Sequence, residues 1–166
     1  MEGKLKNGIL LSLCAIALSL FTWGSASAAI SISLVGVWSE TVDESDLAGG
    51  AGSDLISTYE SASNQVSIDI TGTTGDSDAW RIDVKKTDTS WHSDLHLSLR
   101  RTSDGSGSGS ITGGTSYQEA TDTFTEFFSG SGDRTGINVQ LKITGVSVNV
   151  PTDTYSTTVY YTVVDN

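Results

Sequence analysis

The sequence has almost no cysteine, proline or methionine: it holds one residue of each, Cys14, Pro151 and Met1. Because a single cysteine cannot form a disulfide within the chain, we expect a fold held together by its hydrophobic core. Residues 29–166 hold no thiol at all, which excludes a cysteine nucleophile from that part of the chain. With 166 residues, the chain is long enough for one domain with a core of its own.

Positive charge is also scarce, since 9 basic residues stand against 20 acidic ones. Leaving out Glu2, Lys4 and Lys6 gives residues 29–166 a formal net charge of −12. A chain this acidic repels polyanions, so we expect it to bind neither nucleic acid nor an anionic membrane surface. A strongly negative net charge keeps a protein soluble outside the cell. The same charge makes Ca²⁺ a candidate ligand.

Long apolar runs are limited to Ile9–Phe21, which follows two lysines and precedes Ala26-Ser27-Ala28. This order is typical of a secretion signal with its cleavage site, and the run is too short to span a membrane. We predict that residues 1–28 are a cleaved signal peptide and that residues 29–166 form the working domain. The protein is then secreted, extracellular or periplasmic. Lipid attachment at Cys14 is the alternative, which the continuing apolar run disfavours.

Short segments of alternating apolar and polar residues fill residues 29–166, with Gly/Ser/Thr/Asp loops between them. This alternation predicts half-buried antiparallel strands. Since each sheet needs another to cover its apolar face, we predict an all-β fold: one antiparallel, immunoglobulin-like β-sandwich of about seven to nine strands. The segments are Ile30–Leu34, Val66–Ile70, Trp80–Lys86, Leu95–Leu99, Ile137–Ile143, Val146–Val150 and Tyr155–Val164.

Three stretches show no clear alternation. We expect Asp54–Ser63 to be a loop and Tyr117–Phe128 to be strand-like, because its threonines favour a strand. The glycine-rich stretch Thr102–Ser116 is expected to be an exposed, mobile loop.

Two histidines and an aspartate, His92, Asp94 and His96, are the candidate metal ligands. On a strand, residues two apart share a face, and imidazole with carboxylate suits Zn²⁺ or Cu²⁺. The simpler interpretation is that these three residues only form the polar outer face of a strand, whose inner face carries Leu95 and Leu97. We favour it and predict that the protein binds no metal and no other cofactor.

Catalytic patterns are also missing. The chain has only two histidines and no Gly-x-Ser-x-Gly elbow for a serine nucleophile. Paired carboxylates for glycoside hydrolysis stay open, because their spacing depends on the fold. We predict that the protein is not an enzyme.

Acidic loops and tryptophans leave a ligand-binding module as the alternative function. Acidic oxygens in the loops could hold Ca²⁺, although none has the spacing of a helix–loop–helix calcium site. Tryptophans can stack on sugar rings, although Trp80 shares its face with core residues. The loops are Asp43–Asp46, Asp76–Asp78 and Ser103–Gly105, and the candidate tryptophans are Trp38 and Trp91.

Basic residues gather in one stretch. Five of the seven in residues 29–166 are Arg81, Lys85, Lys86, Arg100 and Arg101. We expect the two segments that carry them to pair as a hairpin. A basic ribbon on an acidic body attracts the acidic face of another copy. The other interpretation is that these charges protect exposed strands from aggregation.

The end of the chain, Tyr155–Val164, reads Tyr-Ser-Thr-Thr-Val-Tyr-Tyr-Thr-Val-Val after a turn. It resembles the final strand of secreted bacterial surface β-sandwiches, the fimbrial and spore-coat-U-like subunits. The resemblance implies an immunoglobulin-like sandwich and assembly by giving a strand to a neighbour, through β-augmentation. Ile30, Ile32 and Leu34, at the predicted new N-terminus, have the alternation that a donor strand needs.

Together these patterns favour a secreted, non-enzymatic surface or fibre-type structural protein that associates with itself by strand pairing. The expected partners are other copies of the chain or envelope proteins. The expected interaction residues are the three apolar residues of the N-terminal segment and the five clustered basic residues.

Overall fold

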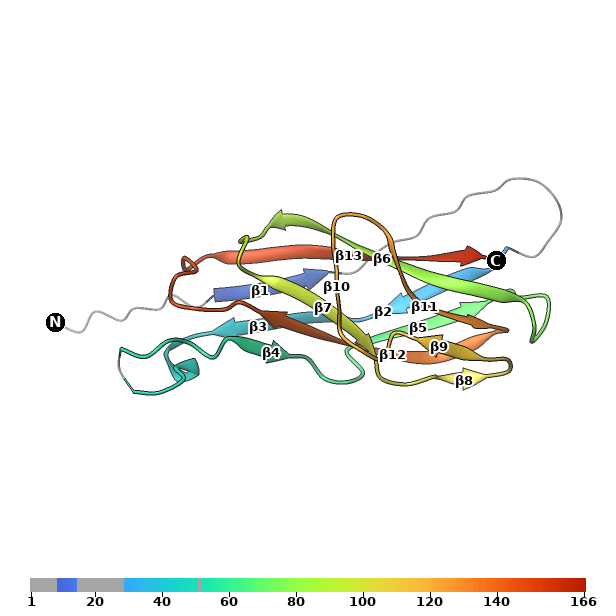
Figure 1. Cartoon of the computed structure of the whole chain (residues 1–166), viewed down its shortest axis with the longest axis horizontal. Coiled ribbons are helices and arrows are strands. Elements are labelled where there is room, and N and C mark those ends of the chain that lie inside the picture. The colour runs from blue at the N-terminus through green and yellow to red at the C-terminus, as the bar shows by residue number, and fades with distance from the viewer. Residues whose placement is uncertain (1–8, 15–28, 51) are drawn as a thin grey trace.

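The computed structural model describes residues 9–14, 29–50 and 52–166. In these residues the chain forms 13 strands and one short 3-10 helix, η1 (Glu44–Asp46). The strands make two sheets whose apolar faces share one core (Figure 1). The prediction of an all-β sandwich is therefore confirmed.

The first sheet, sheet A, has six strands. In spatial order they are β3 (Val37–Val42), β1 (Ile9–Cys14), β13 (Thr154–Asp165), β6 (Ala79–Ser90), β11 (Thr125–Ser131) and β9 (Ile111–Gly113). Neighbouring strands are antiparallel, except that β1 runs parallel to β13.

The second sheet, sheet B, has seven strands. Its main path is β10 (Gln118–Glu119), β7 (His96–Arg101), β12 (Arg134–Thr144), β5 (Val66–Thr71) and β2 (Ser31–Val35). Two short strands, β4 (Thr58–Glu60) and β8 (Ser106–Gly107), pair with β12 beside this path. All pairs in sheet B are antiparallel.

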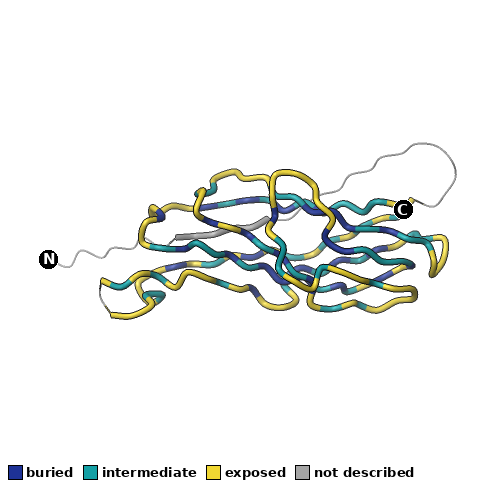
Figure 2. Tube along the Cα trace, viewed as in Figure 1, coloured by how far each residue is buried: buried dark blue, intermediate teal, exposed yellow. Residues whose placement is uncertain are grey.

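The core lies between the two sheets because each long strand turns every second residue inward. Sheet B contributes aliphatic residues such as Ile68, Leu97 and Leu141, all completely buried. Sheet A contributes the aromatic part, where the Trp80 and Phe128 rings meet edge to face at 6.2 Å. Figure 2 shows the buried stretches along the middle of the strands and the exposed residues at the turns.

The strand count of seven to nine was too low. One additional strand, β1, lies in the predicted signal peptide, and β4, β8, β9 and β10 each have only two or three residues. Strands this short show no alternation, so the sequence gives no signal for them. The same limit explains why Asp54–Ser63 was expected to be a loop although β4 lies inside it.

Two other expectations need correction. The stretch Val146–Val150 forms a turn and no strand, with Val146 and Val150 buried and Val148 61% exposed. The stretch Tyr117–Phe128 is only partly strand, because residues 120–124 separate β10 from β11. Within the residues described, the structure contains no helix long and apolar enough to cross a membrane.

Candidate interaction surface at the sheet edges

Strand β2 carries the predicted N-terminal interaction segment and forms the outer strand of sheet B. It pairs antiparallel with β5 over residues 31–35, and no other described strand pairs with it. Ile30, Ile32 and Leu34 are partly buried against the core, while Val35 is 73% exposed. The second edge of β2 therefore has no partner among the described strands, and we call it the open edge of β2. A strand edge without a partner is a template for pairing with another chain.

Gly36 takes the chain from β2 in sheet B directly to β3 in sheet A. Its φ is +148°, and a Cβ at this position would lie 2.2 Å from the carbonyl oxygen of Gln65. Only glycine fits such a close approach of two backbone segments. The crossing between the sheets therefore occurs at one residue, with Val35 and Val37 exposed on either side.

Strand β3 lies at the outer edge of sheet A, and β1 is its only strand partner in the part of the chain described. Trp38 and Val42 of β3 are buried. The structure thus places Ile9–Cys14, a piece of the predicted signal peptide, inside a sheet. The expected cleavage site at Ala26–Ala28 lies outside the described residues, and cleavage there stays a prediction.

The expected basic hairpin is wrong. Arg81, Lys85 and Lys86 lie on β6 in sheet A, whereas Arg100 and Arg101 lie on β7 in sheet B. Strand β6 already pairs with β13 on one side and β11 on the other, so it has no free edge for β7. The chain therefore turns after β6 and enters the opposite sheet.

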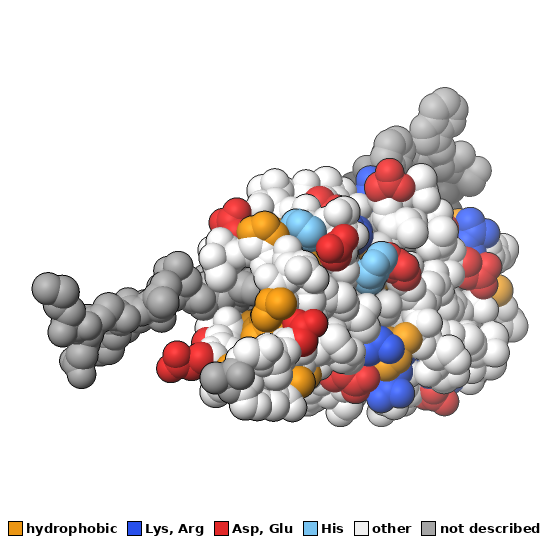
Figure 3. Space-filling model, turned by 60° about the vertical axis from the view of Figure 1, so that its left-hand side comes forward, with side chains coloured by type: hydrophobic (Ala, Val, Ile, Leu, Met, Phe, Trp, Pro, Cys, Tyr) orange, Lys and Arg blue, Asp and Glu red, His pale blue; other side chains and the backbone are white. Residues whose placement is uncertain are grey.

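Each of the five basic residues contacts neighbours within the chain. Arg81 pairs with Asp83 at 3.0 Å and Lys86 with Asp88 at 2.5 Å. Lys85 lies over the Phe124 and Tyr160 rings, and Arg100 donates to the Gln140 side-chain oxygen and lies over the Tyr117 ring. Arg101 donates to the carbonyl oxygens of Gly113 and Ser103 and pairs with the Asp104 carboxylate. Figure 3 shows basic side chains scattered among acidic ones on the face drawn.

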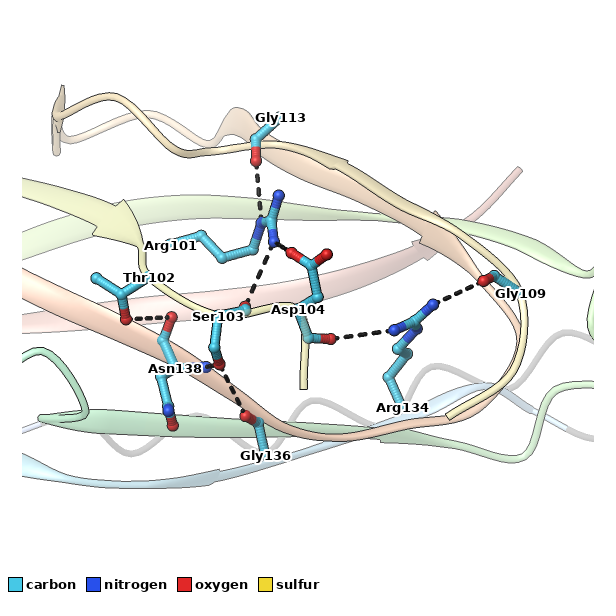
Figure 4. A network of polar contacts seen from close by, with 9 residues as sticks. All are labelled: Arg101, Thr102, Ser103, Asp104, Gly109, Gly113, Arg134, Gly136 and Asn138. Carbon is cyan, nitrogen blue, oxygen red and sulfur yellow. Dashed lines mark hydrogen bonds and ion pairs between the residues drawn. The ribbon is translucent and has the colours of Figure 1, made fainter. Parts of the chain in front are cut away.

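Two buried arginines hold the glycine-rich loop, a role that sequence reasoning missed (Figure 4). Arg101 donates to the carbonyl oxygen of Gly113 at 3.0 Å and pairs with Asp104. Arg134 donates to the carbonyl oxygens of Asp104 at 3.2 Å and Gly109 at 2.7 Å. The stretch Thr102–Ser116 is largely exposed, as expected, but the expectation of a mobile loop is wrong, because β8 and β9 lie within it and pair with β12 and β11.

The three candidate metal ligands do not line up on one strand. His92 and Asp94 lie in the turn before β7, where the Asp94 backbone N–H donates to Nδ1 of His92 at 3.2 Å. His96 begins β7, and its Nδ1 lies 2.7 Å from a carboxylate oxygen of Glu119. In the residues that the structure describes, no three His, Cys, Asp or Glu side chains are placed to hold a metal ion.

The tryptophans do not form an exposed platform within the described chain. Trp38 is 7% exposed and Trp80 is completely buried. Trp91 is partly buried, donates its indole N–H to the Leu95 carbonyl oxygen at 2.7 Å, and has the Lys86 ammonium 5.4 Å from its ring centre. These contacts occupy the indole N–H and one face of the Trp91 ring. No observation therefore favours the stacking of a sugar on Trp91.

The acidic loops use their oxygens within turns. Asp43 accepts hydrogen bonds from the Ser45 hydroxyl at 2.7 Å and the Ser45 backbone N–H at 2.8 Å, which lower the pKa of Asp43. Asp46 in turn accepts from the Asp43 backbone N–H at 2.9 Å. Asp78 accepts from the Thr74 backbone N–H at 2.7 Å. This is the ordinary turn chemistry of aspartate, in which the carboxylate caps nearby backbone N–H groups.

Asp133 ties two loops together and gives a prediction about pH. The Thr73 hydroxyl and backbone N–H donate to Asp133 at 2.7 and 2.9 Å, which lowers the pKa of its carboxyl group. A lowered folded-state pKa stabilises the fold above the ordinary pKa of about 3.9, and this stabilisation is lost as the pH falls through the folded value.

We therefore expect Asp133→Asn to destabilise the protein at pH 7 and to differ less from the wild type at pH 3. Urea unfolding followed by circular dichroism at the two pH values measures this. Asp122→Asn is the control, because it removes the same charge from an exposed loop position. The same pH dependence in both variants would contradict the assigned role of Asp133.

Comparison with models of protein families, with curated proteins and with solved structures finds no match to this chain. The proposed function therefore depends on the geometry described above.

Proposed function

We propose that this protein is a secreted, non-enzymatic structural subunit of the cell surface or of a fibre, and that its copies associate by pairing strands. The observation that carries the proposal is the open edge of β2, which follows the predicted cleavage site by two residues. An edge strand with unpaired N–H and C=O groups binds another extended segment by continuing the sheet.

The charges of the chain fit this proposal. Residues 30–35 carry no charge in a domain whose formal net charge is −12. An uncharged edge adds no repulsion of its own, whereas the acidic remainder of the surface repels other copies through solution. Since salt screens that repulsion, we expect association to strengthen as the salt concentration rises.

The test is the association state of the processed protein, which begins at Ala29. Size-exclusion chromatography with light scattering at low and high salt should show species larger than a monomer. Val35→Lys should shift the protein toward monomer, because a lysine on an edge strand opposes pairing. Val148→Lys is the matched control, since this valine is also exposed, at 61% against 73%, but lies in a turn.

A processed protein that stays monomeric at every salt concentration would contradict the proposed function. Equal association of the Val35→Lys and Val148→Lys variants would show that copies associate away from the β2 edge. Circular dichroism of both variants checks that each one is folded.

A further inference from the structure

Strand β1 occupies the position between β3 and β13 in sheet A (Figure 1). It runs antiparallel to β3, with Ile9 opposite Val42 and Cys14 opposite Val37, and parallel to β13. In the part of the chain described, β3 has no other strand partner. The attachment of β3 to the rest of sheet A therefore depends on its ladder with β1.

The neighbours of this position are buried on the side that faces the core. Ile9 and Leu13 stand opposite the buried Val42 and Trp38 of β3, and Leu11 stands between the half-buried Glu40 of β3 and the buried Tyr155 of β13. A strand held here therefore needs apolar residues opposite Val42 and Trp38, four positions apart. The buried neighbours, each between 2% and 7% exposed, are Trp38 and Val42 of β3 and Tyr155 and Thr157 of β13.

Signal-peptide cleavage after Ala28 would remove β1 together with the rest of residues 1–28. The facing edges of β3 and β13 would then be separated by two strand spacings, which is about 9.5 Å. Both edges would hold unpaired backbone N–H and C=O groups. Unpaired backbone groups beside apolar surface strongly favour the binding of a new strand.

We propose that removal of the signal peptide opens a strand-binding slot between β3 and β13, and that residues 30–35 of a second copy fill it. This inference rests on the proposed self-association and names its acceptor site. In the uncleaved chain, β1 occupies the slot and keeps the chain from assembling.

Residues 30–35 suit the slot because they repeat the pattern of β1. The segment reads Ile-Ser-Ile-Ser-Leu-Val, and β1 reads Ile-Leu-Leu-Ser-Leu-Cys. When Ile30 is aligned with Ile9, both segments have apolar residues at the first, third and fifth positions and serine at the fourth. In the register of β1, the first and fifth positions stand opposite the buried Val42 and Trp38 of β3, and the third stands opposite Glu40.

The exchange also increases strand pairing. In its own chain, β2 is an edge strand that pairs only with β5. In the slot of a second copy, the same segment would pair with β3 on one side and β13 on the other. Because Gly36 joins the segment to β3, each copy would both give a strand and receive one. Such head-to-tail contacts need not close on themselves, and an arrangement that does not close grows into a fibre.

The register gives a direct test with single cysteines, because the processed protein has none of its own. Aligned on β1, Val35 of one copy would stand at the position of Cys14, which is opposite Val37. Processed Val35→Cys and Val37→Cys proteins are mixed with oxidised glutathione. We expect at least about ten times more disulfide-linked dimer than from Val35→Cys with Val148→Cys, because a disulfide needs close, oriented cysteines.

Val148→Cys is a matched control, since Val37 and Val148 are both 61% exposed. A second measurement tests the slot without self-association. A synthetic peptide of residues 8–16, which contains Cys14, should form a disulfide with processed Val37→Cys protein and should inhibit its association. The same peptide with Ile9→Lys and Leu13→Lys should do neither, because the two lysines would stand opposite the buried Val42 and Trp38 and would lose their water.

The outcomes separate this inference from the proposed function. Association without the Val35–Val37 link and without peptide capture would overturn the slot and leave association through the β2 edge standing. If the protein captures the peptide but no disulfide forms between two copies, the slot exists and a second copy does not fill it. A processed protein that is monomeric and binds no peptide, because β3 has moved to pair with β13, would overturn both proposals.

Discussion

Replacing Trp80 by alanine is expected to lower the free energy of unfolding by about 3–5 kcal/mol and the midpoint temperature by about 10–20 °C. Trp80 is completely buried near the start of β6. Its ring packs edge to face on Phe128, and its indole N–H donates to the Gly132 carbonyl oxygen at 2.9 Å. The substitution removes a large apolar surface and leaves the Gly132 carbonyl without this donor.

Two variants identify the source of this loss. Trp80→Phe keeps an aromatic ring and removes the indole N–H, so it should cost less than alanine. Trp91→Ala removes the same side chain from a partly buried position, where the indole N–H also donates to a carbonyl oxygen. Denaturant unfolding followed by circular dichroism compares the three. If Trp80→Ala costs no more than Trp91→Ala, the aromatic part of the core does not stabilise the fold as described.

Period-two alternation predicted the long strands and the sandwich because these strands are half buried. The inward residues Trp80, Ile82 and Val84 alternate with polar ones in the sequence, and all three are completely buried. The partners of each strand were not predictable in the same way. Leu97 and Leu99 showed that β7 has a buried face, but nothing in the sequence says which of the two sheets that face belongs to.

The interaction surface was predictable only in part. The alternation of Ile30, Ile32 and Leu34 identified the N-terminal segment, and the structure places it at an open edge. The position between β3 and β13 was not predictable, because the apolar run Ile9–Phe21 reads as a secretion signal and has no strand alternation. It was found only through the backbone pairing of β1 with two strands.

The buried arginines were missed for a different reason. Charged residues are usually exposed, so Arg101 was assigned to a surface ribbon. The structure shows it 6% exposed, and Arg134 8% exposed, with carbonyl oxygens of the glycine-rich loop as acceptors. A usable signal was the glycine content of that loop, because a backbone without large side chains allows guanidinium groups to approach its carbonyls.

Gly145→Ala is expected to destabilise the protein by about 3 kcal/mol or more. Gly145 follows β12 directly and has a φ of +85°. A Cβ at this position would lie 1.7 Å from the carbonyl oxygen of Asp94, so the backbone of one segment must move. Asp94 lies in the turn through which the chain passes from β6 in sheet A to β7 in sheet B. Moving it would disturb the connection between the sheets.

Gly136→Ala is the matched control, because it separates the contact from the backbone conformation. Gly136 also has a positive φ, +71°, but a Cβ there would meet no atom within 4 Å. Its substitution should therefore cost only the strain of the left-handed conformation, about 1–2 kcal/mol. The difference between the two unfolding free energies measures how closely the β6–β7 turn approaches the end of β12. Equal losses in both variants would mean that the turn moves away at no cost, and that this contact does not fix the crossing between the sheets.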